Sequence, residues 1–395
     1  MAGIGFALLP ATSLVPRTPA HTGPQRRPSR LFNVRVPTPD ALGKAAANVF
    51  DIVFGGGVGN HAARTPAAII DEAPQRTVFR YLDPERRRGA PVLLVPPLAA
   101  PATCMDLRPG CSLAEHLLAA GHATYLVDYG DIAFSDRELG LEHWIEEVIP
   151  RSVERASADA DGQPVTLVGW CLGGIMSLLA TAADPKLPIG GVAAIASPFD
   201  FTRVRLMAPF RADLTNGALV SAAYRLLGGA PAPLVRYAYQ AAALDKQILK
   251  PWAVLTHLDD REFLAQIEAV DAFMADMHAY PGRTFGQLYH RFFRVNELAE
   301  GTLELPERTV DLADVQVPVL VVAGARDGIA PRGAVFSVGD LLPSAPDVRL
   351  ETAPGGHLGV LTGRAARRTT WVYLDEFLDE VALAPLEEAV NATAA

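Results

Sequence analysis

The sequence VTLVGWCLGGIMSLL carries a cysteine in a tight turn between a predicted strand and a predicted helix. β-Branched residues lead into Gly169, Cys171 follows two positions later, and Gly173 and Gly174 open an apolar helical segment. A turn this tight holds its central residue in a strained conformation and leaves no room for side chains two positions before and after it. The positive end of the following helix favours a thiolate. The pattern therefore predicts that Cys171 is a nucleophile rather than an inert buried thiol.

A nucleophile in such a turn is accompanied by an acid and then a histidine later in the chain, each on a loop after a strand. Strand VPVLVVAG leads to Asp327, and strand VRLETA leads to His357 in a glycine-containing loop. Asp200, in SPFDF after another strand, is the rival acid. We prefer Asp327, because Asp200 lies between Phe199 and Phe201 and is interpreted as a loop anchor.

Acyl transfer also needs backbone N–H groups that bind the negative oxygen of the tetrahedral intermediate. The amide of Leu172, directly after the cysteine, is one predicted donor. The second is expected in the loop after the first buried strand, PVLLVPPLAAPATC. Leu98 is the candidate there, because Pro96 and Pro97 have no N–H to donate.

Other residues that are able to do chemistry lack the necessary partners. Cys104 and Cys111 have neither a similar turn nor a nearby histidine, and we interpret them as packing residues. The glycine run Gly55–Gly59 lacks the Gly-Lys-Ser/Thr of a phosphate-binding loop and is predicted to be a flexible turn. His278 and His290 are interpreted as surface or core histidines of a cap, although a cap histidine is also able to line a pocket.

The candidate residues fall at the ends of strands that alternate with helices. Alternation of this kind predicts a mostly parallel sheet with helices on both faces. With the order nucleophile, acid, histidine, it predicts an α/β-hydrolase fold with a helical cap insertion. The expected strands are VFRYL, PVLLVPP, ATYLVDYG, VTLVG, GVAAIAS, VPVLVVAG and VRLETA, and the expected helices are SLAEHLLAAG, residues 141–153 with a kink at Pro150, IMSLLATAA and TTWVYLDEFL.

Composition shifts along the chain predict four parts. Residues 1–35 are rich in Pro, Arg and Ala without hydrophobic periodicity and are expected to be a disordered lead. The hydrolase core is expected over residues 36–202 and 315–382, interrupted by a strandless helical cap over residues 203–314. Residues 383–395 are expected to form a flexible tail.

The 395 residues are half hydrophobic and carry a formal net charge of -9, so nucleic acid is not an expected partner. Three cysteines indicate neither a disulfide framework nor a metal site. The apolar start has no basic residues before it, unlike a signal peptide, and no apolar run is long enough for a membrane span. We expect a soluble cytoplasmic protein that needs no cofactor.

Several stretches resemble, in the same order, landmarks of the polyhydroxyalkanoate synthases, which are polyester-forming acyltransferases. They are GWCLGG, the segment VPPLAAPATCMDLRPGCSLAEHLLAAGHATYLVDYGD with DRELGLEHWIEEVI, SPFDF, YPGRTFGQLYHRFFRVNELAEGTLEL, ARDGIAP and GGHLGVLTG. The resemblance covers about residues 91–363. It implies that Cys171 is acylated from acyl-CoA, that His357 is the general base and that Asp327 is its acidic partner.

The chain departs from that family at three positions around the expected site. Gly328, Phe273 and Tyr129 stand where the family usually has a histidine and two tryptophans. These departures affect the expected substrate and polymerising activity more than the expected roles of Cys171, Asp327 and His357. A lipase, esterase or acyl-CoA thioesterase on the same scaffold is the first alternative, and a noncatalytic protein that coats inclusions is the second. The sequence leaves open a homodimer, a second synthase subunit, and contact with a lipid or polymer inclusion surface.

Overall fold

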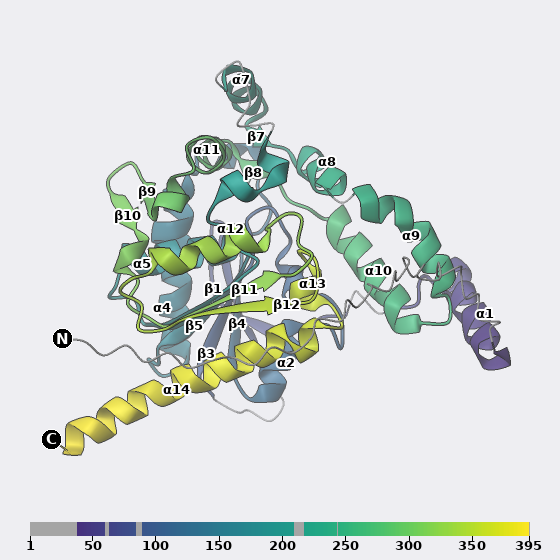
Figure 1. The fold of residues 1–395 in the computed structure, drawn as a ribbon, viewed down its shortest axis with the longest axis horizontal. Coiled ribbons are helices and arrows are strands. Elements are labelled where there is room, and N and C mark those ends of the chain that lie inside the picture. Colours follow the sequence, from purple (N-terminus) through teal and green to yellow (C-terminus); the bar gives the residue numbers. More distant parts are fainter. Residues whose placement is uncertain (1–37, 60–62, 84–88, 209–216, 243, 395) are drawn as a thin grey trace, which may run out of the picture.

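The computed structural model describes residues 38–59, 63–83, 89–208, 217–242 and 244–394, and its centre is an eight-stranded sheet (Figure 1). The strands are β1 Ala67–Ala73, β2 Arg76–Tyr81, β3 Pro91–Val95, β4 Ala123–Asp128, β5 Val165–Trp170, β6 Ile189–Ile195, β11 Val319–Gly324 and β12 Val348–Ala353. They run in the order β1, β2, β4, β3, β5, β6, β11, β12. Neighbours from β4 to β12 are parallel, and β1 and β2 are antiparallel strands at one edge.

The burial of the strands follows their composition. Every residue of β3, β5 and β11 is buried, as expected for apolar, β-branched strands covered on both faces. Strand β1 was not among the predicted strands, because its sequence AAIIDEA lies at the open edge and has mostly exposed or half-buried residues. The predicted α/β architecture, a mostly parallel sheet flanked by helices, is confirmed.

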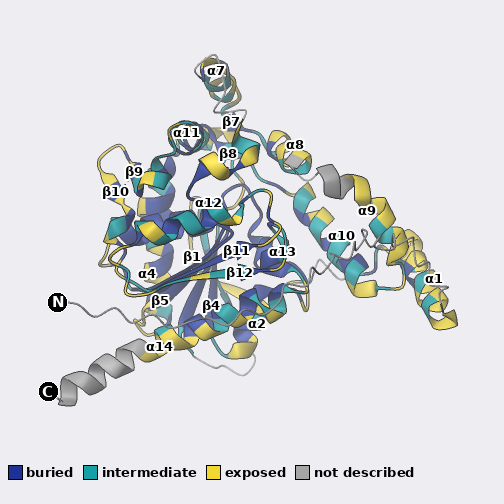
Figure 2. Cartoon of the chain, viewed as in Figure 1, coloured by how far each residue is buried: buried dark blue, intermediate teal, exposed yellow. Residues whose placement is uncertain are grey.

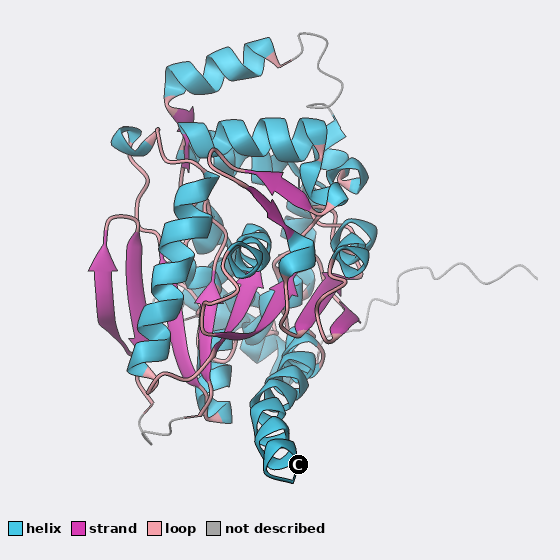
Figure 3. Cartoon of the chain, turned by 90° about the vertical axis from the view of Figure 1, so that its left-hand side faces the viewer, coloured by secondary structure: helices cyan, strands magenta, loops and turns pink. Residues whose placement is uncertain are grey.

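Helices cover both faces of the sheet (Figure 3). Helices α4 and α5 pack against each other and against β5 on one face, whereas α2 and α14 pack together on the other. Gly121 ends α2 in the left-handed region at φ 97°, as the sequence predicts. These helices are α2 Leu113–Ala120, α4 Ile149–Asp159, α5 Leu172–Ala183 and α14 Thr370–Ala394, and shorter ones are α3 Leu141–His143, α12 Arg332–Phe336 and α13 Gly359–Thr362.

The predicted helix over residues 141–153 is interrupted just before Pro150. Helix α3 passes through a π-helical turn, Trp144–Val148, into α4. Pro150, which has no N–H, stands in the first turn of α4, directly after the π-helical turn. The apolar stripe that predicted this helix is buried against the sheet.

The cap over residues 203–314 is mainly helical, but the prediction that it lacks strands is wrong. Two small antiparallel pairs lie within it, each with only two or three residues per strand, too short for an alternating pattern to mark them in the sequence. The strands are β7 Gly229–Ala230 with β8 Tyr280–Pro281, and β9 Thr302–Glu304 with β10 Thr309–Asp311. The helices are α7 Ala218–Leu227, α8 Ala232–Ala242, α9 Leu244–Thr256, α10 Arg261–Ala275 and α11 Gly282–Gln287, followed by a π-helical turn at Leu288–Val295.

Helix α1, Pro39–Phe54, packs beside the cap although its residues were assigned to the core (Figure 1). The side-chain amide of Asn48 donates to the carbonyl of Leu258 at 2.7 Å. Arg261, at the start of α10, pairs with Asp51 at 2.5 Å. Helix α1 leaves several apolar side chains exposed (Figure 2). The polar contacts of Asn48 and Asp51, rather than burial of an apolar face, therefore hold it against the cap.

The two ends of the chain compare differently with prediction. The predicted disordered lead, residues 1–35, lies outside the described residues. The predicted flexible tail instead continues α14 as a helix to Ala394, because the alanine, leucine and glutamate of this segment are strong helix formers. In the described parts of the chain, no helix is both long and apolar enough to span a membrane.

Candidate active site

Cys171 lies in the sharp turn between β5 and α5. Its backbone has φ 54° and ψ −120°, an uncommon conformation for a residue with a side chain, so the turn is strained. The backbone N–H of Cys171 donates to the carbonyl of Ile195, at the end of β6, at 2.8 Å. This bond ties the turn to the neighbouring strand, and the cysteine side chain stays partly exposed.

The glycines around Cys171 permit close backbone contact. A Cβ on Gly169 would lie 2.4 Å from the amide nitrogen of Gly174, and one on Gly173 would lie 2.1 Å from the carbonyl oxygen of Val95. A Cβ on Gly174 would lie 2.2 Å from Oγ of Ser197. All three distances are shorter than any side chain tolerates, so the turn requires glycine at each position.

The structure brings His357 and Asp327 together on adjacent loops after β12 and β11. Oδ2 of Asp327 lies 2.8 Å from Nδ1 of His357, and both side chains are almost fully buried. The other oxygen, Oδ1, accepts hydrogen bonds from the amides of Ile329 at 2.8 Å and Ala330 at 2.9 Å. The carboxylate is therefore fixed in place, and the ring is oriented with Nε2 left for another partner.

That partner is Cys171, whose sulfur is close enough to act on the pKa of His357. Burial alone lowers this pKa, but the charges of Cys171 and Asp327 and their hydrogen bonds to the ring raise it to about 10. Two acidic neighbours on one imidazole favour its protonated form. The arrangement thus supports an imidazolium on His357, next to Cys171.

Asp200, the rival acid, binds other groups. It accepts hydrogen bonds from the amide of Thr202 at 3.0 Å, from Arg203 at 2.7 Å and from the side chain of Asn296 at 3.1 Å. Burial raises the pKa of Asp200, but these hydrogen bonds outweigh it and lower the pKa. Asp200 therefore anchors the loop after β6 to the end of the cap.

The two predicted oxyanion donors are residues of the turn around Cys171 and of the turn after β3. Leu172 is the first residue of α5, so its amide is at the positive end of that helix. Leu98 is buried in the turn after β3, and the close approach of Gly173 to Pro96 places this turn beside the elbow. The hydroxyl of Tyr129 donates to the carbonyl of Pro96 at 3.0 Å and helps to hold the turn.

Sequence reasoning missed several aromatic residues around the site. Nε1 of Trp170 donates to the carbonyl of His357 at 3.2 Å, and the two rings are 5.0 Å apart. Phe273 of α10 lies 6.2 Å from the Trp170 ring. Two phenols of the cap have a raised pKa: that of Tyr239 rises chiefly through the charge of Tyr280, that of Tyr280 chiefly through burial, and Cys171 contributes to both. Phe273, Trp170 and Tyr280 carried a signal through their places in the family pattern, whereas Tyr239 carried none.

The remaining candidates lie outside this cluster. Cys104 and Cys111 are buried, and Sγ of Cys111 accepts a hydrogen bond from Nη2 of Arg367 at 3.0 Å. In the glycine run, the amides of Val58 and Gly59 donate to Glu268 of α10, so this turn binds a carboxylate of the chain itself. The two cap histidines each contact one neighbour. Nδ1 of His278 lies 3.2 Å from the carbonyl oxygen of Gly130, and Nε2 of His290 lies 3.1 Å from Oγ of Ser221.

Comparison with known proteins gives a family match and several similar sequences. A family model described as alpha/beta hydrolase fold matches residues 90–363. The poly(3-hydroxyalkanoate) polymerase subunit PhaC of Allochromatium vinosum is 25% identical over 328 residues, which cover 80% of this chain and 89% of that protein. The corresponding subunit of Synechocystis sp. is 25% identical over 309 residues, which cover 77% and 82%. Mouse alpha/beta hydrolase domain-containing protein 10 superposes with a TM-score of 0.47 at 16% identity and covers 80% of this chain and 99% of that one.

The family match extends over more than half of the chain. It includes the turn around Cys171 and the loops that carry Asp327 and His357. The chain therefore belongs to the α/β-hydrolase fold family, and within it the sequence is similar to the poly(3-hydroxyalkanoate) polymerases.

Proposed function

We propose that this chain is an acyltransferase of the polyhydroxyalkanoate synthase type, which moves (3-hydroxy)acyl groups from acyl-CoA to a hydroxyl acceptor through a thioester on Cys171. The observation that carries the proposal is the strained cysteine beside His357, which is itself held by Asp327 at 2.8 Å. The similarity to proteins named poly(3-hydroxyalkanoate) polymerase supports the choice of substrate and acceptor.

In the first half of the reaction, the sulfur of Cys171 attacks the carbonyl carbon of acyl-CoA. His357 takes the thiol proton and returns it to the departing CoA sulfur, while Asp327 stabilises the imidazolium. The amides of Leu172 and Leu98 are the donors for the oxyanion. One thioester replaces another, so the step is nearly thermoneutral and the acyl group keeps its reactivity.

In the second half, His357 removes the proton from the hydroxyl of a 3-hydroxyacyl unit or chain end. That oxygen attacks the Cys171 thioester, an ester forms, and the cysteine sulfur leaves with the proton from His357. The aromatic side chains of Trp170, Phe273 and Tyr280 surround the site and favour transfer over hydrolysis by keeping water out.

The test is to incubate the purified protein with 3-hydroxybutyryl-CoA, follow the release of CoA and identify the product. Polyester together with an acyl group on Cys171, detected by mass spectrometry, is the expected result, and Cys171→Ala should abolish both. Free 3-hydroxybutyrate as the sole product would replace the proposal by the thioesterase alternative. Unchanged acyl-CoA would favour the noncatalytic, inclusion-coating alternative.

A further inference from the structure

A pocket of about 610 Å³ lies in the cap between α7, α11 with the following π-helical turn, and the loop before α3. Arginines are prominent in its lining although the chain as a whole is acidic, with a formal net charge of -9. The charged lining residues are Arg137, Arg225, Arg283, Arg291, Glu138 and Glu297. A concentration of guanidinium groups in a hollow favours a ligand that carries several negative charges.

Two of these arginines are oriented by glutamates without using all of their donors. Nη2 of Arg283 lies 2.7 Å from Glu142. Nη1 of Arg291 lies 2.9 Å from Glu297 and 3.0 Å from Glu304. A guanidinium has five N–H donors, and these contacts engage one nitrogen of each arginine. Both groups are thus held rigidly and keep further donors for an anion.

Arg225 brings an additional positive charge from the last turn of α7. Its effect reaches His290 in the pocket wall, because burial and then the charges of Arg294 and Arg225 lower the pKa of that histidine. Nε2 of His290 lies 3.1 Å from Oγ of Ser221 on α7. A bound anion would offset the positive field and raise the pKa of His290 again.

Aromatic rings connect this pocket with Cys171. The Tyr224 ring, in the pocket wall, lies so close to Gly286 that a Cβ there would be 2.7 Å from the Tyr224 hydroxyl. Ring centroids are 5.8 Å apart between Tyr224 and Phe285 and 6.2 Å apart between Phe285 and Tyr280. Burial, and then the charge of Cys171, raise the pKa of Tyr280. Two ring spacings therefore separate the pocket wall from Tyr280.

We propose that this pocket binds the phosphate-bearing nucleotide end of acyl-CoA, with Arg225, Arg283 and Arg291 on the phosphates. This inference rests on the acyl-CoA chemistry proposed above. The pantetheine arm of CoA is about twelve bonds long, which in an extended chain reaches roughly 14 Å. That reach exceeds the two ring spacings of 5.8 and 6.2 Å between Tyr224 and Tyr280, so a nucleotide held in the pocket is able to direct its thioester past Tyr280 toward Cys171.

The test uses two substrates that differ only in the nucleotide, 3-hydroxybutyryl-CoA and 3-hydroxybutyryl-pantetheine, with the full-length chain. Arg225 is exposed, so Arg225→Glu should fold normally, and Arg225→Gln is a milder second variant. For the CoA substrate we expect KM to rise about tenfold or more at unchanged kcat, as for the loss of a hydrogen bond between charged groups. For the pantetheine substrate KM should stay as in the unaltered chain. Equal KM changes with both substrates, or none with either, would overturn the proposal.

Direct binding separates this inference from the proposed function. Adenosine 3′,5′-bisphosphate is titrated into the Cys171→Ala chain by calorimetry, with and without Arg225→Glu, and Arg151→Glu on α4 is the control for net charge. We expect Arg225→Glu to weaken binding about tenfold and Arg151→Glu to leave it unchanged. If the unaltered chain turns over neither thioester but binds the bisphosphate through Arg225, the proposed reaction fails while the nucleotide site stands. Absence of bisphosphate binding overturns the nucleotide site, whatever the activity.

Discussion

His357 lies between Asp327 and Cys171, and Asp327 fixes which ring nitrogen is left for the sulfur. We therefore expect Asp327→Asn to lower the rate of CoA release by several orders of magnitude, since neutralising a triad aspartate costs about 10⁴ when the tautomer becomes wrong. Asp200→Asn should reduce the rate far less, because Asp200 binds Thr202 and Arg203. Steady-state kinetics on both variants checks this. Greater damage from the Asp200 change would move the acid to the loop after β6.

The raised pKa of His357, about 10, has a consequence for the reactivity of Cys171. Because the imidazolium persists from acidic pH up to about 10, the positive charge beside Cys171 stays the same throughout the neutral range. Alkylation of Cys171 by iodoacetamide should therefore change little between pH 6 and pH 8. In His357→Gln, which removes this charge, the rate should be lower at pH 6.

Site-resolved mass spectrometry follows this reaction, and the buried Cys104 and Cys111 serve as internal controls that should react slowly. A steep rise of the rate for Cys171 between pH 7 and 9 in the unaltered chain would contradict a persistent imidazolium on His357. A rate that stays the same in His357→Gln would show that the helix end, rather than the imidazolium, stabilises the thiolate.

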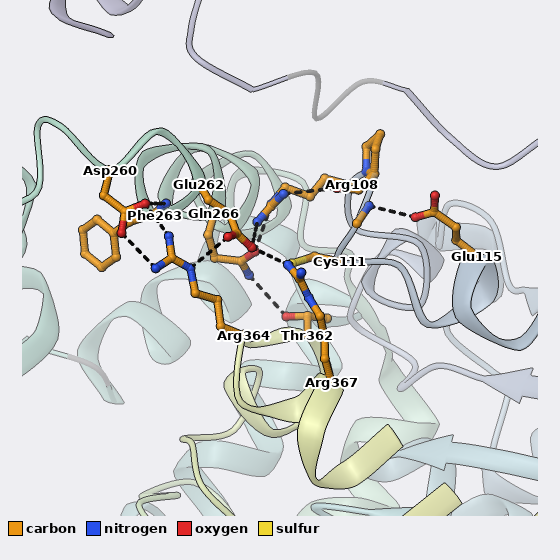
Figure 4. Close-up of polar contacts among 12 residues, drawn as sticks. Arg108, Cys111, Glu115, Asp260, Glu262, Phe263, Gln266, Thr362, Arg364 and Arg367 are labelled. Atoms are coloured by element: carbon orange, nitrogen blue, oxygen red, sulfur yellow. Dashed lines mark hydrogen bonds and ion pairs between the residues drawn. The ribbon is translucent and has the colours of Figure 1, made fainter. Parts of the chain in front are cut away.

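Among the elements, α10 is bound to the core through residues of its first turn (Figure 4). Asp260 caps the helix by accepting from the amide of Phe263 at 3.0 Å. The same carboxylate binds Arg364, from the loop after α13, through two nitrogens. The hydrogen bond from Arg364 is the largest cause of the lowered pKa of Asp260. One side chain thus both starts the helix and attaches it to the core.

A second set of contacts continues along the same face of α10 (Figure 4). Glu262 pairs with Arg367, and Oε1 of Gln266 accepts from Nε of Arg108 at 3.0 Å. These partners come from positions about 100 to 160 residues away in the chain. No local pattern in the sequence reveals such pairs, so the attachment of α10 to the core was not predictable.

We expect Arg364→Ala to loosen the start of α10 without unfolding the chain. The pair is partly exposed, so its loss should cost about 1 kcal/mol or less, but the Asp260 cap loses its support. Amide exchange followed by mass spectrometry should be faster in the first turns of α10 and unchanged in the sheet. Arg151→Ala, which removes an exposed pair with Glu154 on α4, is the matched control. Exchange in α10 equal to that of the control would show that the clamp contributes nothing.

At the scale of the whole molecule, the sequence predicts the features that depend on local chemistry. The elbow around Cys171 follows from glycines whose missing side chains the backbone contacts demand, and the buried strands follow from their composition. Features that depend on distant contacts were missed or misplaced. Helix α1 was assigned to the core because nothing local links it to Leu258. Tyr239 gave no signal because its interaction with Tyr280 depends on the folded cap.

The last prediction concerns which part of the cap moves. Helices α7 to α9 expose large apolar side chains, among them Leu226, Ile248 and Trp252, whereas α10 buries Leu264 and Phe273 (Figure 2). Elements with few buried contacts open at low free energy, so we expect fast amide exchange in α7 to α9 and slow exchange in α10 and the sheet. A nonhydrolysable acyl-CoA analogue should slow exchange in α7 and α8 in particular, because ligand binding stabilises the closed arrangement. If α7 to α9 are as protected as the sheet both with and without the analogue, the cap is static and substrate reaches Cys171 by another route.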